Sequence, residues 1–197
     1  LATAKYFTSE FVRLQNGSNI GFALKHRSEN PNFYGLIGNQ TIDLSLSYST
    51  SSEFGANGYQ AIAIGNNIKS RGDQSVGIGV LAETSANSVS IGNTVISGYS
   101  SVAIGSNSNA NGSQATAVGN QATATGFFST SVGSSKAIGQ RATAIGVGNK
   151  ANVDYSNTLG GSFLNANVYK SVVLGFSNPI KTNQSTTTWV PTDDLFV

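Results

Sequence analysis

The side chains that could carry out catalysis are few in this sequence, and their spacing does not bring them together. His26 is the only histidine and cysteine is absent, so the many serines have no base partner within any motif. Asp193 and Asp194 form the only adjacent pair of carboxylates, while Asp43 has no partner at a usable spacing. Because catalysis requires an acid, a base or a nucleophile to converge in one pocket, the sequence predicts no catalytic residues and no enzyme.

The motifs also give no support for a metal site or a cofactor. A single histidine and the absence of cysteine leave no histidine- or thiolate-based ligand set within one chain. Acidic residues rarely recur at the turns, so the calcium-binding solenoid pattern is missing. Neither a Walker A phosphate loop nor a glycine-rich dinucleotide motif in a βαβ setting occurs. We therefore expect no metal and no cofactor.

Charge and hydropathy argue against two further kinds of partner. The formal net charge is +2, charged residues make up 10% of the chain, and no basic run is interleaved with aromatics, which argues against nucleic acid. No apolar run approaches roughly eighteen residues, so no segment is expected to insert into a membrane. Methionine and cysteine are both absent, which is compatible with a processed piece of an extracellular protein.

Most of the chain, residues 61–175, consists of a repeat, and the fold of this repeat must position the side chains within it. Nine short phrases each end in glycine, and successive glycines lie 13 to 15 residues apart. A second, weaker set of glycines lies half-way between, and Asp154 takes the equivalent place once. Each unit is expected to hold two short strands and two tight turns, with glycine where a turn needs positive φ. The weaker glycines are Gly58, Gly72, Gly98, Gly112, Gly126 and Gly139.

Within each phrase, apolar and small residues alternate with a period of two, which predicts strands rather than helices. The small residues include Ala63, Gly77 and Ser90. The predicted fold is therefore all-β, a parallel β-solenoid whose coils stack at about 4.8 Å. We expect the apolar residues to form its structural core column: Ile64, Ile78, Ile91, Ile104, Val118, Val132, Ile145, Leu159 and Leu174.

A second stripe on the same strands is expected to form their other face. A lone chain would leave part of this stripe in water, whereas burial against copies of itself would contribute about 25 cal/mol per Å². A homo-oligomer about the rod axis is therefore expected. The stripe is apolar at first and hydroxylated later: Ile62, Val76, Val89, Val102, Thr116, Thr130 and Thr143.

The phrases NSVSIGN, SSVAIGSNSNANGSQATAVGNQATATG and QRATAIGVGNKA resemble the head repeats of YadA-type trimeric adhesins. In that family about fourteen residues make one turn of a left-handed parallel β-roll, and the rolls of the homotrimer share a common axis. The resemblance covers roughly residues 58–175 and implies an intertwined homotrimer. The SSKAIGQ stretch is one residue short, and the last coils change to NTLGG and VVLGF, so the register of the outer coils is open.

Three regions are expected along the chain. Residues 1–57 form an N-terminal connector, residues 58–175 the β-roll, and residues 176–197 an exit segment and cap. The exit segment places Trp189 over the open last coil, whose strand edges would otherwise be unpaired. The natural chain is expected to continue past Val197, because it ends on an apolar run.

The connector should contain a hairpin over residues 11–24 that turns at Asn16-Gly17, and a further strand within residues 33–49. The charged run Lys25-His26-Arg27 is interpreted as a solvated loop, with a docking patch as the alternative. The scattered cations of the roll are interpreted as groups that keep its outer surface soluble. They are Lys69, Arg71, Lys136, Arg141 and Lys150.

One column of the roll is aromatic and provides the candidate receptor contacts. Each of its rings follows the glycine of the weaker turn or its substitute, and Phe128 lies beside them. Exposed rings of this kind can stack on sugars, which would suit a cell-surface glycan. The alternative is that they pack at the corner of the roll or between chains. The candidates are Tyr59, Tyr99, Phe127, Phe128 and Tyr155.

The resemblance implies a non-enzymatic trimeric fibre segment that attaches to a receptor outside the cell. The run IDLSLSYSTSSEFGANGYQAIAIG and the exit phrase WVPTDDLFV resemble the junctions of tail fibres in phages and phage-like injection particles. We therefore expect a tail fibre of a virion or an injection particle. The alternative is the head domain of a trimeric adhesin on a bacterial cell surface. An ice-binding solenoid is a further alternative, suggested by the column of Thr116, Thr130 and Thr143. It is remote because this column spans few coils.

Overall fold

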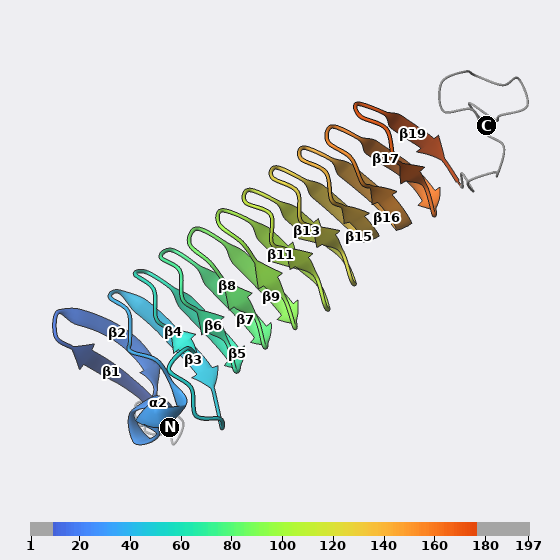
Figure 1. The fold of residues 1–197 in the computed structure, drawn as a ribbon. Coiled ribbons are helices and arrows are strands. Elements are labelled where there is room, and N and C mark those ends of the chain that lie inside the picture. The colour runs from blue at the N-terminus through green and yellow to red at the C-terminus, as the bar shows by residue number, and fades with distance from the viewer. Residues whose placement is uncertain (1–9, 177–197) are drawn as a thin grey trace, which may run out of the picture.

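The computed structural model describes residues 10–176 and shows an elongated rod of stacked β-coils (Figure 1). An antiparallel hairpin, β1 (Phe11–Asn16) and β2 (Asn19–Leu24), lies at one end, and β19 (Val172–Gly175) lies at the other. Each coil contributes a longer and a shorter strand, and each strand pairs in parallel with its equivalent in the next coil. The prediction of an all-β solenoid with coils of 13 to 15 residues is confirmed.

The longer strands form one ladder, which we call the long-strand ladder. It begins at β2, which pairs in parallel with β3. Its members after β2 are β3 (Thr41–Leu46), β5 (Ile62–Asn66), β7 (Val76–Val80), β9 (Val89–Asn93), β11 (Val102–Ile104), β13 (Thr116–Val118), β15 (Thr130–Ala137), β16 (Thr143–Ala151), β17 (Asn157–Ser162) and β19.

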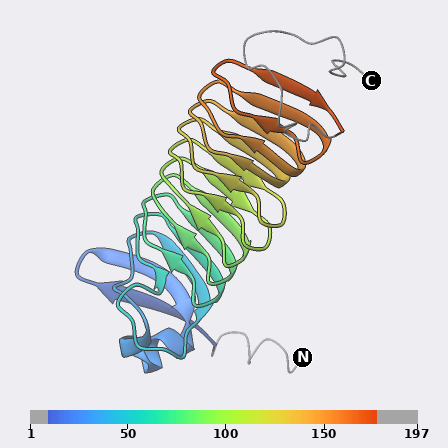
Figure 2. The same cartoon turned by 45° about the vertical axis from the view of Figure 1, so that its right-hand side comes forward.

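The shorter strands form the short-strand ladder on the other side of each coil. The ends of β15 and β16 also belong to it, because these two strands run through the turn and pair again at Lys136 and Lys150. Both ladders can be followed along the rod in Figure 2. The other members are β4 (Gly55–Ala56), β6 (Lys69–Ser70), β8 (Glu83–Thr84), β10 (Ile96–Ser97), β12 (Asn109–Ala110), β14 (Thr123–Ala124) and β18 (Asn165–Ala166).

The lumen between the ladders is filled by small side chains. Ser70 Oγ donates to the Ile62 carbonyl oxygen at 2.7 Å, and the hydroxyls of Ser90 and Ser97 lie 2.8 Å apart, so the two ladders touch across the interior. Alanine, serine and threonine are the only side chains that fit such a gap, apart from larger groups at its edge such as Ile68 and Leu164.

The predicted core column is wrong, because its residues point outward. None of the nine is buried in the single chain, and Leu174 is 51% exposed. The buried column is the small one that alternates with it. The narrow lumen has no room for branched side chains on every rung, so period-two alternation places them outside. The misassigned residues are Ile64, Ile78, Ile91, Ile104, Val118, Val132, Ile145, Leu159 and Leu174.

The glycines of the two turns have different roles. Those that end the repeated phrases adopt φ between 90° and 153°, as expected. The weaker glycines do not have positive φ, which corrects the prediction; the residue two places later does, as at Gln114 (57°). A Cβ on Gly112 would instead overlap the carbonyl oxygen of Gly126 in the next coil. These positions are therefore glycine because successive turns approach each other closely.

The register of the outer coils is continuous. Ile145 pairs with Leu159 and Leu159 with Leu174, so the long-strand ladder keeps its alignment to β19. The short SSKAIGQ stretch is accommodated by a register shift between Ser134 and Lys136. A second register shift follows between Ile145 and Val147, so changes in coil length are taken up late in the long strands and leave the pairs before them aligned.

The N-terminal connector is joined to the first coil by strand pairing and by two short helices. The predicted hairpin is present: Asn16 pairs with Asn19, and Gly17 takes φ of 60° at the turn. α2 (Lys25–Glu29) and the 3₁₀ turn η1 (Pro31–Phe33) lead from β2 to β3. The boundaries of the three predicted regions remain predictions, and the prediction for Trp189 falls outside the described residues.

Candidate functional site

The weaker turn of each coil presents two outward positions, which we call x and y, in the pattern Gly-x-y-Ser/Ala. In the turn Gly126-Phe127-Phe128-Ser129, Phe128 takes φ of 57°, and its N–H donates to the carbonyl oxygen of Ser113 in the previous coil at 3.1 Å. The same hydrogen bond recurs along the rod, for example from Arg141 N to Phe127 O at 2.8 Å. Side chains at x and y are therefore stacked at the coil spacing of about 4.8 Å.

All five aromatic candidates lie at this edge, but not in one column. Val153, and not Asp154, takes the place of the glycine, as the Ser156 N–H donating to Val153 O shows. Tyr155 therefore lies at position y with Phe128. Tyr169 lies at position x and was missed, because Val168 replaces the glycine that would have marked it. Position x thus holds Tyr59, Tyr99, Phe127 and Tyr169, with non-aromatic residues between.

Side chains at the last four of these turns form a continuous cluster, whereas Tyr59 and Tyr99 stand apart from it. The rings of Phe127 and Phe128 meet edge to face with centroids 4.2 Å apart, and those of Tyr155 and Tyr169 meet similarly at 5.6 Å. The Arg141 guanidinium lies 5.6 Å from the Phe128 centroid and 5.5 Å from that of Tyr155. We call this the aromatic–cation cluster: Phe127, Phe128, Arg141, Tyr155, Tyr169 and Lys170.

Arg141 was expected only to keep the surface soluble, yet it holds the cluster together. Its Nη1 donates to the Tyr155 hydroxyl at 2.8 Å while its plane lies between two rings of neighbouring coils. Such cation–π contacts contribute about 0.5–1 kcal/mol each at exposed sites. Lys170 extends the arrangement, with its ammonium 5.1 Å from the Tyr169 centroid.

A second surface, the apolar face, is formed by the outward side chains of the long-strand ladder. The stripe that begins at Ile62 was predicted to oppose the Ile64 column, but residues two apart on a strand share a face, so both lie outside. Together they form two parallel ranks of branched side chains. The first rank pairs in register from Phe22 through Ile42, Ile62, Val76, Val89 and Val102.

The sequence of the middle coils matches a known repeat. The family model described as YadA head domain repeat (2 copies) matches residues 97–122, 110–135 and 137–156. The chain carries YadA head domain repeats. This repeat is a structural adhesin module, and the matched residues include Phe127, Phe128, Arg141 and Tyr155 of the cluster. No curated protein matches the chain.

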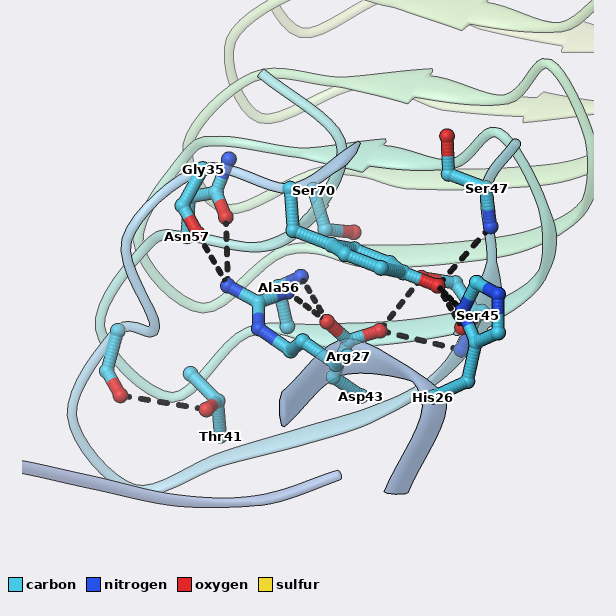
Figure 3. A network of polar contacts seen from close by, with 12 residues as sticks. His26, Arg27, Gly35, Thr41, Asp43, Ser45, Ser47, Ala56, Asn57 and Ser70 are labelled. Carbon is cyan, nitrogen blue, oxygen red and sulfur yellow. Dashed lines mark hydrogen bonds and ion pairs between the residues drawn. The ribbon is translucent and has the colours of Figure 1, made fainter. Parts of the chain in front are cut away.

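A buried ion pair within the connector holds α2 against β3 (Figure 3). Arg27 and Asp43 are 4% and 1% exposed, and their side chains form a salt bridge. Arg27 Nη2 also donates to the Gly35 carbonyl oxygen at 2.6 Å, while Asp43 accepts from Ser45 Oγ at 2.6 Å and from the Ala56 N–H at 3.2 Å. The prediction that Arg27 lies in a solvated loop is wrong, and the pairing of Asp43 with Arg27 was missed.

Burial shifts the pKa values of two side chains in this network, Arg27 and Tyr34. Desolvation lowers the pKa of the Arg27 guanidinium, an effect that the facing Asp43 carboxylate opposes. Desolvation likewise raises the pKa of the Tyr34 hydroxyl, which donates to Ser45 O and accepts from the Ser47 N–H. These side chains all have protein partners, so the network stabilises the connector.

The described residues contain no other arrangement that indicates a reaction centre. Within residues 10–176, no group of three or more His, Cys, Asp or Glu side chains is placed to hold a metal ion. No helix in the described part of the chain has the length and apolar character that a membrane crossing requires. The two surfaces of interest are therefore the aromatic edge and the apolar face.

Proposed function

We propose that this chain is a segment of a homotrimeric, non-enzymatic attachment fibre that acts outside the cell. The observation that supports this most strongly is the apolar face. Its side chains run along the rod, while the lumen is already filled by small residues, so the face has no partner among residues 10–176. Burial of this area would contribute about 25 cal/mol per Å². Copies of the same chain supply a matching surface about a common axis.

The YadA head repeats favour the adhesin form of this proposal over the tail-fibre form. The family model that matches the coils is described as the YadA head domain repeat, an adhesin module. The tail-fibre prediction rested on the junction and exit phrases, and the exit phrase lies outside the described residues. We therefore place the head of a bacterial surface adhesin first and a tail fibre second. Sequence flanking this segment distinguishes them: a membrane anchor belongs to an adhesin, and a baseplate-attachment segment to a fibre.

The mass in solution tests the trimer. Light scattering at micromolar concentration should give about three times the chain mass of 20.3 kDa. Ile91→Lys places an ammonium in the apolar face and should shift the mass toward that of one chain, because a buried charge without a partner is costly. Ile96→Lys is the matched control, because it makes the same substitution at an exposed isoleucine of the short-strand ladder, beside Glu83. A wild-type monomer would overturn the proposal.

Attachment is measured separately, by binding of the fluorescently labelled trimer to whole bacterial and animal cells. Saturable binding to one cell type supports the attachment function, and binding to none opposes it. The threonine column, Thr116, Thr130 and Thr143, is in register on consecutive coils. The remote ice-binding alternative therefore stays testable, and a lack of thermal hysteresis would dismiss it.

A further inference from the structure

Two lysines of the short-strand ladder repel each other without a counter-charge. Lys136 and Lys150 are register partners on β15 and β16, and both are exposed. Adjacent strands lie about 4.8 Å apart, and like charges directly opposite each other are destabilising. Within residues 10–176, no carboxylate lies within ion-pair distance of either ammonium.

Elsewhere on the short-strand ladder, the lysine at the equivalent outward position has acidic partners that neutralise its charge. Lys69 and Glu83 are register partners on β6 and β8, and the Lys69 ammonium lies 3.9 Å from Glu83 and 2.9 Å from Glu53. Arg71 pairs with both carboxylates as well. The hydrogen bond from Lys69 and the charge of Arg71 lower the pKa of Glu53. A carboxylate can therefore lie beside a lysine on this ladder, as at Lys69. Among the described residues, Lys136 and Lys150 have no such partner.

The lysine pair lies next to the aromatic–cation cluster. Lys136 precedes Arg141 by five residues, and Lys150 precedes Tyr155 by five, on the coils that carry the cluster. At about 3.3 Å per residue, the lysine rank lies on the order of 15 Å from the turn. One acid, Asp154, faces this region, and its carboxylate accepts the Gln140 N–H at 2.8 Å. The surface therefore combines cations with exposed rings.

The lysine pair lies on the opposite side of the coil from the apolar face. The inward side chains of the two ladders contact each other, as the hydrogen bond between the Ser90 and Ser97 hydroxyls shows, so their outward sides point in opposite directions. A trimer that buries the long-strand ladder leaves the short-strand ladder accessible. The two surfaces can therefore be used at the same time.

We propose that Lys136, Lys150 and the aromatic–cation cluster form a binding site for an anionic polysaccharide. The inference rests on the proposed attachment function and names the receptor class. The exposed rings of Phe127, Phe128 and Tyr169 offer apolar surface to sugar rings, and the ammonium and guanidinium groups pair with carboxylate or sulfate groups. Nucleic acid is a poorer match, because the chain has a net charge of only +2 and no basic stripe.

Four polymers test the ligand class by calorimetry on the whole protein. Polygalacturonate carries only carboxylates, dextran sulfate only sulfates, dextran no charge, and duplex DNA supplies phosphates. We expect binding to one or both acidic polysaccharides, weakening as salt is added, and none to dextran. Binding to only one of them identifies the anionic group. Equal binding to dextran, preferential binding to DNA, or no binding to either acidic polysaccharide overturns the proposal.

Two sets of variants test the residues. Lys136→Asn/Lys150→Asn should weaken binding about five- to tenfold, and asparagine already occupies this rank at Asn109 and Asn165. The control Arg13→Asn/Lys25→Asn removes the same charge from exposed sites in the connector and should change binding less than twofold. Phe128→Gln should weaken binding at low and high salt alike, and glutamine is native at this turn position in Gln114. Its control is Tyr59→Gln, outside the cluster.

The outcomes separate this inference from the function on which it rests. A trimer that attaches to cells but binds neither acidic polysaccharide keeps the proposed function and loses the inference. Unchanged binding by the double lysine variant also overturns the site. A monomer that does not attach to cells removes the proposed function itself, whatever the polymers show.

Discussion

At the scale of single residues, Arg27 shows what the sequence could not reveal. It lies in the densest charge run of the chain, which is typical of a solvated loop, yet its side chain is buried against Asp43. The two residues are 16 positions apart and come together because β2 pairs with β3, which sets Ala23 beside Asp43, and α2 follows β2 directly. Local pattern carries no information about such a tertiary pairing.

Removing one partner of this pair should be costly. Arg27→Met leaves the Asp43 carboxylate buried without its counter-charge, so we expect the free energy of unfolding to fall by about 3–5 kcal/mol. Chemical denaturation followed by circular dichroism measures it. The control is Lys25→Met, which breaks only the exposed pair with Glu29 and should cost less than about 0.5 kcal/mol. Equal losses in the two variants would contradict a structural role for the Arg27–Asp43 pair.

A second prediction concerns the close approach of neighbouring turns. Gly112→Ala places a Cβ against the backbone carbonyl of Gly126, which cannot move without disturbing the next coil. We expect a loss of about 1–3 kcal/mol in stability, as for other overpacked sites. Ser113→Ala, the adjacent half-buried residue, should change stability by less than about 0.5 kcal/mol. Thermal unfolding compares the two, and a neutral Gly112→Ala would show that the turns are looser than the structure indicates.

At the scale of the strands, the sequence predicted the period and the register correctly, but not which face lies inside. Alternation between Ile64 and Ala63 establishes a strand whichever residue points inward. General hydrophobicity favours isoleucine in the core, and that choice is wrong here, because a coil of 13 to 15 residues encloses only a narrow lumen. The outcome depends on how far apart the two ladders lie, which turn geometry sets and composition does not.

The narrow lumen leads to a test with two neighbouring positions. Ala117 is fully buried between Ala103 and Ser131, whereas Thr116 points outward from the same strand. Ala117→Val should destabilise the protein by about 1–3 kcal/mol through overpacking. Thr116→Val should change stability by less than about 0.5 kcal/mol in the monomer. Because both variants create valine on β13, strand propensity cannot explain a difference, and denaturation curves that coincide would contradict a filled lumen.

At the scale of the whole molecule, the rod has two outward sides of opposite character. The apolar face along the long-strand ladder has no partner among the described residues, and the short-strand ladder carries the charged side chains of Lys69, Glu83, Lys136 and Lys150. In the proposed trimer, assembly uses the long-strand ladder, and the lysines of the proposed binding site lie on the short-strand ladder. In this arrangement the solenoid can lengthen by adding coils without altering either surface.

If assembly stabilises the rod, its unfolding must depend on protein concentration. A trimer that dissociates as it unfolds gains stability by mass action, so Tm should rise by several degrees over a hundredfold increase in concentration. Differential scanning calorimetry measures this for the wild type and for Ile91→Lys, which exposes the apolar face. The variant should have a lower Tm that does not change with concentration, whereas Ile96→Lys, on the opposite ladder beside Glu83, should behave as the wild type. A wild-type Tm independent of concentration would mean that the apolar face is covered by something other than copies of this chain.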